Sequence, residues 1–347
     1  MVKALRWDGP RTVSVADVPD PTLIDEDSAI LEVSSSGICG SDLHTYSGYE
    51  FAPDPGFILG HEAVGRVLEV GSAVRTIEKG HRVLVPASAG CLTCPSCSAG
   101  WTMGCLDGHG TTYGIGIGHS GLQAQYAAIT GADRNLTRIS DAISDDAAVV
   151  LTDNLPTGWN AVQQAEVRPG SVVAVVGLGP VGLSAVMSAV ACGASRVLAI
   201  DPLPDRRAAA VEVVGVGVFA DDIVEAVRDL TDGHNADCVV EAVGAAPTIT
   251  TSIGLAAVGG HLAIAGVPPL TMEWPIMHVF ALQLTVRQGA CSVQQQLPPL
   301  LRLVEVGKMR PEALVSHHFP LTEGPLGYTT FASREPGTRK IVFNVEQ

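Results

Sequence analysis

Basic residues are scarce in this 347-residue chain. It contains 21 lysines and arginines against 36 aspartates and glutamates, which gives a formal net charge of −15. A phosphate backbone is bound by concentrated lysine and arginine side chains, and no stretch of this sequence concentrates them. The composition therefore excludes nucleic acid as a partner.

Signals for export and membrane attachment are also missing. The first eight residues, MVKALRWD, carry charge where a secretory leader needs an apolar segment, and no lipidation motif is visible. The one long uncharged stretch, residues 169–195, contains glycines and a proline. These predict a strand, a turn and a packed helix rather than a membrane span. We expect a cytoplasmic protein with no membrane contact.

The chain is long enough for two domains, and 46% of its residues are hydrophobic. Up to about residue 150, short β-rich segments are separated by Gly, Pro and Asp clusters, which is typical of an antiparallel barrel or sandwich. These segments are 30–34, 63–70, 82–85 and 124–128. After Asp153 strands and helices alternate, which predicts a doubly wound parallel sheet. The expected strands are 172–176, 196–200, 238–241 and 261–265, with a last one at 340–345 that rejoins the first domain.

Four cysteines are clustered in one short segment. Their spacing is C-x2-C-x2-C-x7-C, formed by Cys91, Cys94, Cys97 and Cys105. Four such thiolates can close a tetrahedral shell around one Zn²⁺. A pair of disulfides is the alternative, which the lack of a secretory leader and the scattered positions of the other four cysteines disfavour. We therefore expect a structural zinc site that stabilises the fold and does not catalyse.

A glycine-rich turn is expected to bind a dinucleotide. It follows one predicted strand, opens a predicted helix, and is formed by Gly177, Leu178, Gly179, Pro180, Val181 and Gly182. Its amides and the helix dipole can hold a pyrophosphate. Asp201 ends the next strand 19 residues after Gly182, where a carboxylate can bond the adenosine ribose, although it can also cap the following helix.

The same aspartate bears on the choice of cofactor. A carboxylate at position 201 repels a 2′-phosphate, so we expect NAD(H) to be preferred over NADP(H). Arg206 and Arg207 follow closely and can compensate for that repulsion, which leaves NADP(H) open as the alternative.

Three further segments each place a possible metal ligand beside small or turn-forming residues. They are GICGSDLH at 37–44, GHE at 60–62 and LTDNLPTG at 151–158. In this order, together with the cysteine cluster and the glycine-rich turn, they resemble the zinc-dependent medium-chain alcohol dehydrogenases over almost the whole chain. The resemblance implies a GroES-like β-barrel catalytic domain at 1–154, with a structural zinc lobe at 90–106, completed by 293–347. It implies a Rossmann dinucleotide-binding domain at 155–292.

By this resemblance Cys39, His61 and Asp153 hold a catalytic zinc ion, and Glu62 either lies beside the metal or binds it exchangeably. Many relatives have a second cysteine in place of Asp153, and the T-D-x-x-P-T-G form is similar to secondary alcohol and formaldehyde dehydrogenases. Two anionic ligands would formally neutralise the dication either way, so its Lewis acidity toward an alcohol should persist. Singly, the three residues could be a small buried thiol, a loop histidine and a helix cap.

The resemblance also implies reversible hydride transfer between an alcohol and NAD, with a zinc-bound alkoxide in the cleft between the domains. Ser41 would bond the alkoxide, and His44 would pass the proton through the nicotinamide ribose to solvent, unless His44 is only a surface histidine. Thr157 would lie against the nicotinamide, and Arg339 or Lys340 would reach the pyrophosphate.

The expected composition of the working enzyme is two zinc ions and one NAD(H) per chain, in a homodimer or homotetramer. Its substrate would be a small-molecule alcohol, aldehyde or ketone, with secondary alcohols, polyols and small primary alcohols the first to test. Two alternatives stay open: a zinc-free NADPH-dependent quinone or enoyl reductase, and a non-catalytic relative that only binds dinucleotide.

Overall fold

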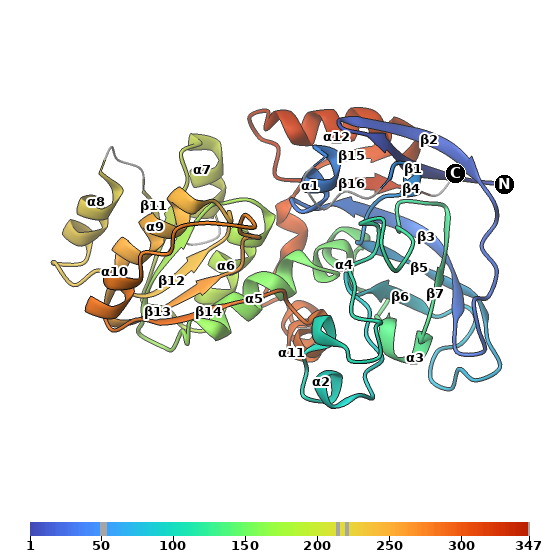
Figure 1. The fold of residues 1–347 in the computed structure, drawn as a ribbon, viewed down its shortest axis with the longest axis horizontal. Coiled ribbons are helices and arrows are strands. Elements are labelled where there is room, and N and C mark those ends of the chain that lie inside the picture. The colour runs from blue at the N-terminus through green and yellow to red at the C-terminus, as the bar shows by residue number, and fades with distance from the viewer. Residues whose placement is uncertain (49–53, 213–215, 219–221, 346–347) are drawn as a thin grey trace. The chain divides into compact units, whose positions relative to one another are not determined.

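Two compact units make up the chain (Figure 1). The first has two sheets and the second has one, and each unit has its own apolar core. The structure is a computed structural model that describes residues 1–48, 54–212, 216–218 and 222–345. One unit comprises Met1–Asp153 with Ser292–Gln347, and the other comprises Asn154–Cys291. No helix among the described residues is long and apolar enough to cross a membrane.

The first unit is built on mostly antiparallel strands (Figure 1). A seven-stranded sheet has the order β15-β16-β3-β5-β6-β8 with β7 paired to β3, and a three-stranded sheet has the order β2-β1-β4. The strands are β1 (Val2–Gly9), β2 (Thr12–Val18), β3 (Ala29–Ile38), β4 (Phe57–Ile58), β5 (Ala63–Val70), β6 (Arg82–Val85), β7 (Tyr126–Ile129), β8 (Thr137–Arg138), β15 (Val315–Pro320) and β16 (Lys340–Asn344). The helices are α1 (Asp42–Tyr46), α2 (Pro95–Ser98), α3 (Ala132–Asn135), α4 (Asp145–Leu151), α11 (Val293–Glu305) and α12 (Gly324–Ser333), and the 3₁₀ turns are η1 (Thr102–Gly104), η2 (Pro311–Leu314) and η3 (Leu321–Glu323).

β3 is the central strand of this unit, and α4 is tied to it. β3 pairs with β5, β7 and β16 and is buried along most of its length. Asp145 in the first turn of α4 accepts hydrogen bonds from Ser34 and Ser35 of β3 at 2.8 and 2.9 Å. Ser144 caps the same helix by accepting the Ala147 N–H at 3.2 Å. These hydrogen bonds hold the first turn of α4 against β3.

The second unit has one parallel sheet (Figure 1). Its six strands have the order β11-β10-β9-β12-β13-β14, and all five pairings are parallel. β9 and β12 are neighbours although β10 and β11 separate them in sequence, so the strand order reverses there, which is where doubly wound sheets bind ligands. The strands are β9 (Val172–Val176), β10 (Arg196–Ile200), β11 (Val216–Val218), β12 (Ala236–Glu241), β13 (Ala256–Ile264) and β14 (Thr285–Gln288), and the helices are α5 (Asn154–Gln164), α6 (Pro180–Ala191), α7 (Pro204–Glu212), α8 (Ile223–Leu230), α9 (Ala246–Leu255) and α10 (Ile276–Ala281).

The fold class predicted from the sequence is confirmed: a β-rich unit is combined with a doubly wound parallel sheet. The observed bounds of β5, β6, β9 and β10 match the predicted ranges 63–70, 82–85, 172–176 and 196–200. β3 is longer than the predicted 30–34, because its pairing with β16 extends to Ile38. That extension brings the end of β3 to the residue before Cys39.

Candidate active site

Four ligand-type side chains converge at the carboxyl end of β3. One sulfur, one imidazole nitrogen and two carboxylate oxygens lie within 4.8 Å of one another and belong to Cys39, His61, Glu62 and Asp153. Cys39 Sγ is 3.0 Å from Asp153 Oδ2, and His61 Nε2 is 3.6 Å from the same oxygen. Buried sulfur, nitrogen and oxygen donors in one place are the set that zinc prefers, so these residues fit that ion.

Strand pairing explains why the cysteine and the histidine meet. β3 and β5 run antiparallel with Ser36 opposite Ala63, so residues just after β3 and just before β5 lie at the same end of the pair. Gly37 gives room for the cluster. A Cβ at this position would lie 1.9 Å from Glu62 Oε2 and 3.0 Å from Lys340 Nζ. Only glycine fits there without moving the buried carboxylate.

Asp42, which the sequence pattern alone did not single out, holds both Cys39 and His61. Its Oδ2 accepts the Cys39 N–H at 2.8 Å, and its Oδ1 lies 3.1 Å from His61 Nδ1. The Asp42 side chain is almost fully buried. A carboxylate at Nδ1 orients an imidazole and leaves Nε2 to face a metal. Because ligating histidines usually have such a partner, a search for a carboxylate near His61 is the signal that would have pointed to Asp42.

Glu62 forms a buried ion pair with Lys340 through Oε2. Both side chains are fully buried, and Lys340 Nζ also donates to the Ile38 carbonyl at 2.9 Å. The other carboxylate oxygen, Glu62 Oε1, has no hydrogen-bond partner within the described part of the chain. The ammonium of Lys340, one of the two groups expected to reach a pyrophosphate, is thus enclosed and engaged by Glu62.

Charges in the cluster shift its pKa values in opposite directions. Burial raises the pKa of Cys39 to about 11, and the carboxylate of Asp153 adds to that rise. Burial also disfavours ionised Asp153, but the His61 hydrogen bond and charge outweigh it and hold that pKa at about 2. Burial acts to lower the pKa of His61, yet Asp42 and Asp153 hold it well above its ordinary value. A dication bound here would displace protons from the thiol and the imidazole.

Ser41 and His44 lie on the segment that follows Cys39. Ser41 precedes α1, and its Oγ is 3.4 Å from His61 Nε2. The His44 backbone N–H donates to the Ser41 carbonyl at 3.0 Å. Burial lowers the pKa of His44, which favours its neutral form near pH 7. Ser41 therefore borders the ligand cluster, and His44 follows it within one helical turn.

The four cysteines of the lobe form the second cluster, in which all Sγ atoms lie within 4.8 Å of one another. All four are free thiols rather than disulfides. Cys94 Sγ accepts N–H groups from Cys97 and Leu106, both at 3.4 Å, and these bonds lower the pKa of Cys94 to about 6. Amide donors directed at sulfur favour the thiolate, the form that binds zinc.

The glycine-rich turn connects β9 to α6. Gly177 has a positive φ of +88°, and a Cβ on Gly182 would lie 1.7 Å from the Gly177 carbonyl oxygen. By contrast, a Cβ on Gly179 would meet no atom within 4 Å. Packing alone does not require glycine at 179, and open space over the backbone suits a ligand that approaches the turn closely. Pro180 and Val181 are the first residues of α6, whose amino end faces this turn.

Asp201 directly follows β10 and organises its loop. Its Oδ2 accepts the Leu178 N–H and its Oδ1 accepts the Leu203 N–H, both at 2.9 Å. Arg206 Nη1 lies 3.7 Å from Oδ2. Arg207 instead donates to the carbonyls of Asp201 and Pro202 at 2.7 and 2.9 Å. Arg206 is thus the guanidinium paired with the carboxylate, while Arg207 is engaged with the backbone.

Thr157 belongs to the second unit and Arg339 to the first. Thr157 is half-buried in α5. The adjacent Gly158 allows α5 to pack closely on α6, since a Cβ at position 158 would lie 2.6 Å from the Ala185 nitrogen. Arg339 precedes β16, is partly exposed, and its backbone N–H donates to Ser316 Oγ at 2.9 Å.

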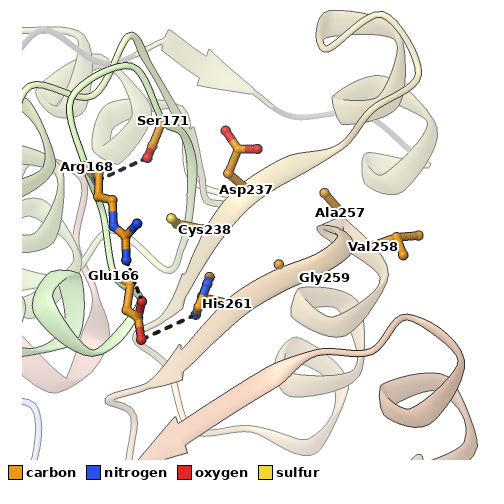
Figure 2. A pocket seen from close by; sticks show the side chains of 10 residues that line it. Glu166, Arg168, Ser171, Asp237, Cys238, Ala257, Val258, Gly259 and His261 are labelled. Atoms are coloured by element: carbon orange, nitrogen blue, oxygen red, sulfur yellow. Dashed lines mark hydrogen bonds and ion pairs between the residues drawn. The ribbon is translucent and has the colours of Figure 1, made fainter.

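A hollow of about 250 Å³ lies at the amino-terminal parts of β9, β12 and β13. Figure 2 shows the side chains that line it. Its polar lining is an ion-pair cluster, in which Glu166 lies 3.1 Å from Arg168 Nη2 and 3.9 Å from His261 Nδ1. The glycine-rich turn and Asp201 follow the carboxyl ends of β9 and β10. The hollow is therefore separate from the candidate dinucleotide residues.

Comparisons with known proteins agree with this arrangement. The family "Alcohol dehydrogenase GroES-like domain" matches residues 25–141, and "Zinc-binding dehydrogenase" matches residues 180–305. A probable zinc-binding alcohol dehydrogenase of Mycobacterium tuberculosis is 36% identical over 334 residues, covering 96% of this chain and 86% of that protein. The solved alcohol dehydrogenase TADH from Thermus sp. ATN1 is 34% identical with a TM-score of 0.94, covering 99% of this chain and 100% of that one.

A second solved structure, the apo form of zinc dependent alcohol dehydrogenase 2 from Streptococcus pneumonia, is 32% identical with a TM-score of 0.91, and both chains are covered completely. These matches confirm the resemblance found in the sequence, including the GroES-like domain and the oxidoreductase class. The chain belongs to the zinc-dependent medium-chain alcohol dehydrogenase family.

Proposed function

We propose that this protein is a zinc-dependent, NAD-preferring dehydrogenase that transfers a hydride reversibly between a small alcohol and the dinucleotide. The observation that carries the proposal is the convergence of Cys39, His61 and Asp153 while Lys340 engages Glu62. With Glu62 held by the lysine, three protein ligands remain for the metal. Three ligands and one open position are the arrangement of catalytic rather than structural zinc sites.

The chain's own residues would hold the metal and move one proton. When bound, zinc would supply a Lewis acid that makes an alcohol hydroxyl more acidic, and the dinucleotide would accept the hydride. Ser41 Oγ borders the cluster and would accept the substrate proton while giving its own proton to His44. His44 suits this task because burial lowers its pKa, which keeps the imidazole neutral and able to accept.

The NAD preference rests on Asp201. Its carboxylate is 4% exposed and lies beside the glycine-rich turn, where it would accept hydrogen bonds from ribose hydroxyls. A 2′-phosphate at the same place would meet that negative charge. Arg206 is already 3.7 Å from Asp201, so its charge is partly neutralised before a phosphate could use it.

The experiment that tests the proposal combines zinc analysis with an alcohol and carbonyl panel, assayed with NAD(H) and with NADP(H). Two zinc ions per chain and alcohol oxidation that favours NAD support it. Zinc in the lobe alone, with dinucleotide binding but no turnover, would indicate the non-catalytic relative. NADPH oxidation that persists without zinc at Cys39 would indicate the quinone or enoyl reductase. A Cys39→Ser variant is the matched control, because it removes one ligand and keeps the lobe.

A second copy of this chain is the proposed partner of the second unit. β14 pairs with β13 alone among the described strands, and α10 has no buried residue. Six large apolar side chains around α10 are exposed: Val267, Leu270, Trp274, Ile276, Met277 and Phe280. An open sheet edge beside an apolar patch is costly to leave in water and suits pairing with the same edge of an identical chain.

A further inference from the structure

Gln123 lies between the two backbone segments that carry Cys39 and His61, and its side chain is fully buried. On one side its Nε2 donates to the carbonyl oxygen of Gly37 at 2.8 Å, two residues before Cys39. On the other side its backbone N–H donates to the Leu59 carbonyl at 3.0 Å, two residues before His61. Gln123 therefore connects the backbone segments that lead into Cys39 and into His61.

The contact with the second segment is also steric. Gly60, which directly precedes His61, has a positive φ of +87°. A Cβ on Gly60 would lie 2.4 Å from Gln123 Cγ, and the Leu122 N–H donates to the Gly60 carbonyl at 2.9 Å. The turn that presents His61 is packed directly on the Gln123 side chain, so its position depends on where that side chain lies.

Tyr328 of α12 fixes the orientation of the Gln123 amide. Its hydroxyl donates to Gln123 Oε1 at 2.8 Å, and the tyrosine side chain is fully buried. Because a phenol near neutral pH donates, the amide oxygen must face Tyr328 and the amide nitrogen must face Gly37. A flipped amide would place two carbonyl oxygens against each other in a buried site, which is unfavourable.

The backbone just before and at Cys39 is held by three buried side chains in succession. Gln123 bonds the carbonyl of residue 37, Lys340 bonds the carbonyl of residue 38, and Asp42 bonds the N–H of residue 39. Asp42 also contacts His61, and Lys340 also contacts Glu62. Among the described residues, the hydrogen bonds of Gln123 next to the cluster are made with backbone atoms. Its effect on the metal would be one of position, not of charge.

We propose that Gln123 is a positioning residue that sets the separation of Cys39 and His61 for metal binding, and that Tyr328 locks it in the required orientation. The inference rests on the proposed function, since it takes Cys39, His61 and Asp153 as zinc ligands. Residues that orient metal ligands change metal affinity by about 10- to 100-fold when they are replaced. Gln123 belongs to that group although its hydrogen bonds beside Cys39 and His61 are made with the backbone.

The test is zinc release from the purified full-length protein to a chromophoric chelator. Gln123→Met keeps the length of the side chain and removes its N–H donor and its acceptor. We expect one of the two zinc ions to leave about 10-fold faster or more, while release of the other is unchanged. The Cys39→Ser variant should retain only the lobe zinc, so its release curve identifies which kinetic phase belongs to the lobe. Release from the lobe then serves as an internal control for general loosening of the fold.

Two further variants complete the experiment. Tyr328→Phe removes a single hydroxyl and should accelerate release of the same zinc ion by a smaller factor, about threefold, because the amide is freed but not deleted. Tyr113→Phe is the matched control, since Tyr113 is another fully buried tyrosine of this unit whose hydroxyl has no hydrogen-bond partner among the described residues. It should release both zinc ions as the wild type does.

The possible outcomes separate the inference from the proposed function. A wild-type chain that binds zinc only in the lobe contradicts the proposed function. Two zinc ions in the wild type with unchanged release from Gln123→Met overturn the inference alone, as does equal acceleration of both ions. If Gln123→Met does not fold, Tyr328→Phe decides, and unchanged release from that variant overturns the inference.

Discussion

Lys340 and Glu62 form an ion pair in which neither side chain is exposed to solvent. The two residues lie 278 positions apart in sequence. Lys340 begins β16 and Glu62 directly precedes β5, and they meet beside the carbonyl of Ile38, the residue before Cys39. Burial raises the pKa of Glu62, and the ammonium of Lys340 opposes that rise. The charge of the Glu62 carboxylate is therefore already compensated by Lys340.

Removal of Lys340 should destabilise the fold, because Glu62 stays buried. We expect Lys340→Met to lower the free energy of unfolding by about 3–5 kcal/mol, because Glu62 is left buried without a countercharge. The loss should be smaller at pH 5 than at pH 8, since Glu62 can then take up a proton. Urea unfolding of both proteins at the two pH values measures this.

The Glu62→Gln and Lys340→Met double variant is the control for that measurement. It removes both charges, so it should recover part of the lost stability relative to Lys340→Met. A double variant that is less stable than the lysine variant would show that the ion pair is not the source of the effect.

The cysteine lobe should affect stability before it affects chemistry. Cys94→Ser should bind one zinc ion fewer per chain, and a loss of about 3 kcal/mol would lower Tm by roughly 6–12 °C. Hydride transfer per folded chain should stay close to that of the wild type, measured by zinc analysis, calorimetry and turnover below the transition. Cys192→Ser, outside both clusters, is the control. A variant that kept wild-type stability and lost only turnover would contradict a structural lobe.

Cofactor preference should respond to Asp201. The Asp201→Asn change retains an acceptor for a loop amide and removes the negative charge that, by the proposed function, would face a 2′-phosphate. We expect the ratio of kcat/KM for NAD to that for NADP to fall about 10-fold or more, the value of one charged hydrogen bond. Adding Arg206→Ala should reverse part of the gain for NADP. An unchanged ratio in Asp201→Asn would remove this residue from cofactor selection.

Acid stability should depend on Asp145. Burial disfavours its ionised form, but hydrogen bonds from Ser34, Arg82 and Ser35 outweigh that effect and hold its pKa below the ordinary value. Its stabilisation is therefore complete above the unfolded pKa of about 3.9 and disappears as the pH falls through the lower folded pKa. Asp145→Asn should cost about 1 kcal/mol or less at pH 7, because the side chain is partly exposed, and the cost should shrink as the pH falls through the lowered folded pKa. Urea unfolding across this range would show a constant difference if Asp145 does not titrate as described.

Assembly should depend on the apolar face of the second unit. Phe280 is 76% exposed on α10, and Phe280→Asp places a charge in the centre of the proposed contact between copies. We expect light scattering after gel filtration to show a smaller species than the wild type. Val211→Asp, which changes an exposed valine on α7, should leave the mass unchanged. Equal masses for wild type and Phe280→Asp would exclude this face as the interface.

Strands with a strong local pattern could be predicted from the sequence, and weakly patterned strands could not. Residues 172–176 and 196–200 are short apolar runs next to glycine or charge, and β9 and β10 have those bounds. β4 and β8 have two residues each, and most of β14 is exposed, so no alternation or apolar run marks them. These strands form because a neighbouring strand pairs with them, which a local pattern does not report.

In the candidate site, too, some residues could be predicted from the sequence and others could not. Cys39, His61, Glu62 and Asp153 stand in motifs, and the structure brings them together. Gln123, which supports them, carries no such mark, because it is 86 positions from Gly37 and 205 from Tyr328. Contacts of this kind depend on the whole fold. Lys340 illustrates the limit, since nothing in its local sequence indicates that the fold buries it against Glu62.

The four sulfurs of the lobe lie within 4.8 Å of one another. Thiols at that separation are within reach of disulfide formation once no metal holds them, and the low pKa of Cys94 keeps a reactive thiolate among them at neutral pH. A chain that loses its lobe zinc in air would therefore be exposed to oxidation, and a lobe closed by disulfides cannot take the metal back until a reductant opens them. Recovery of the lobe metal would thus require reducing conditions as well as zinc.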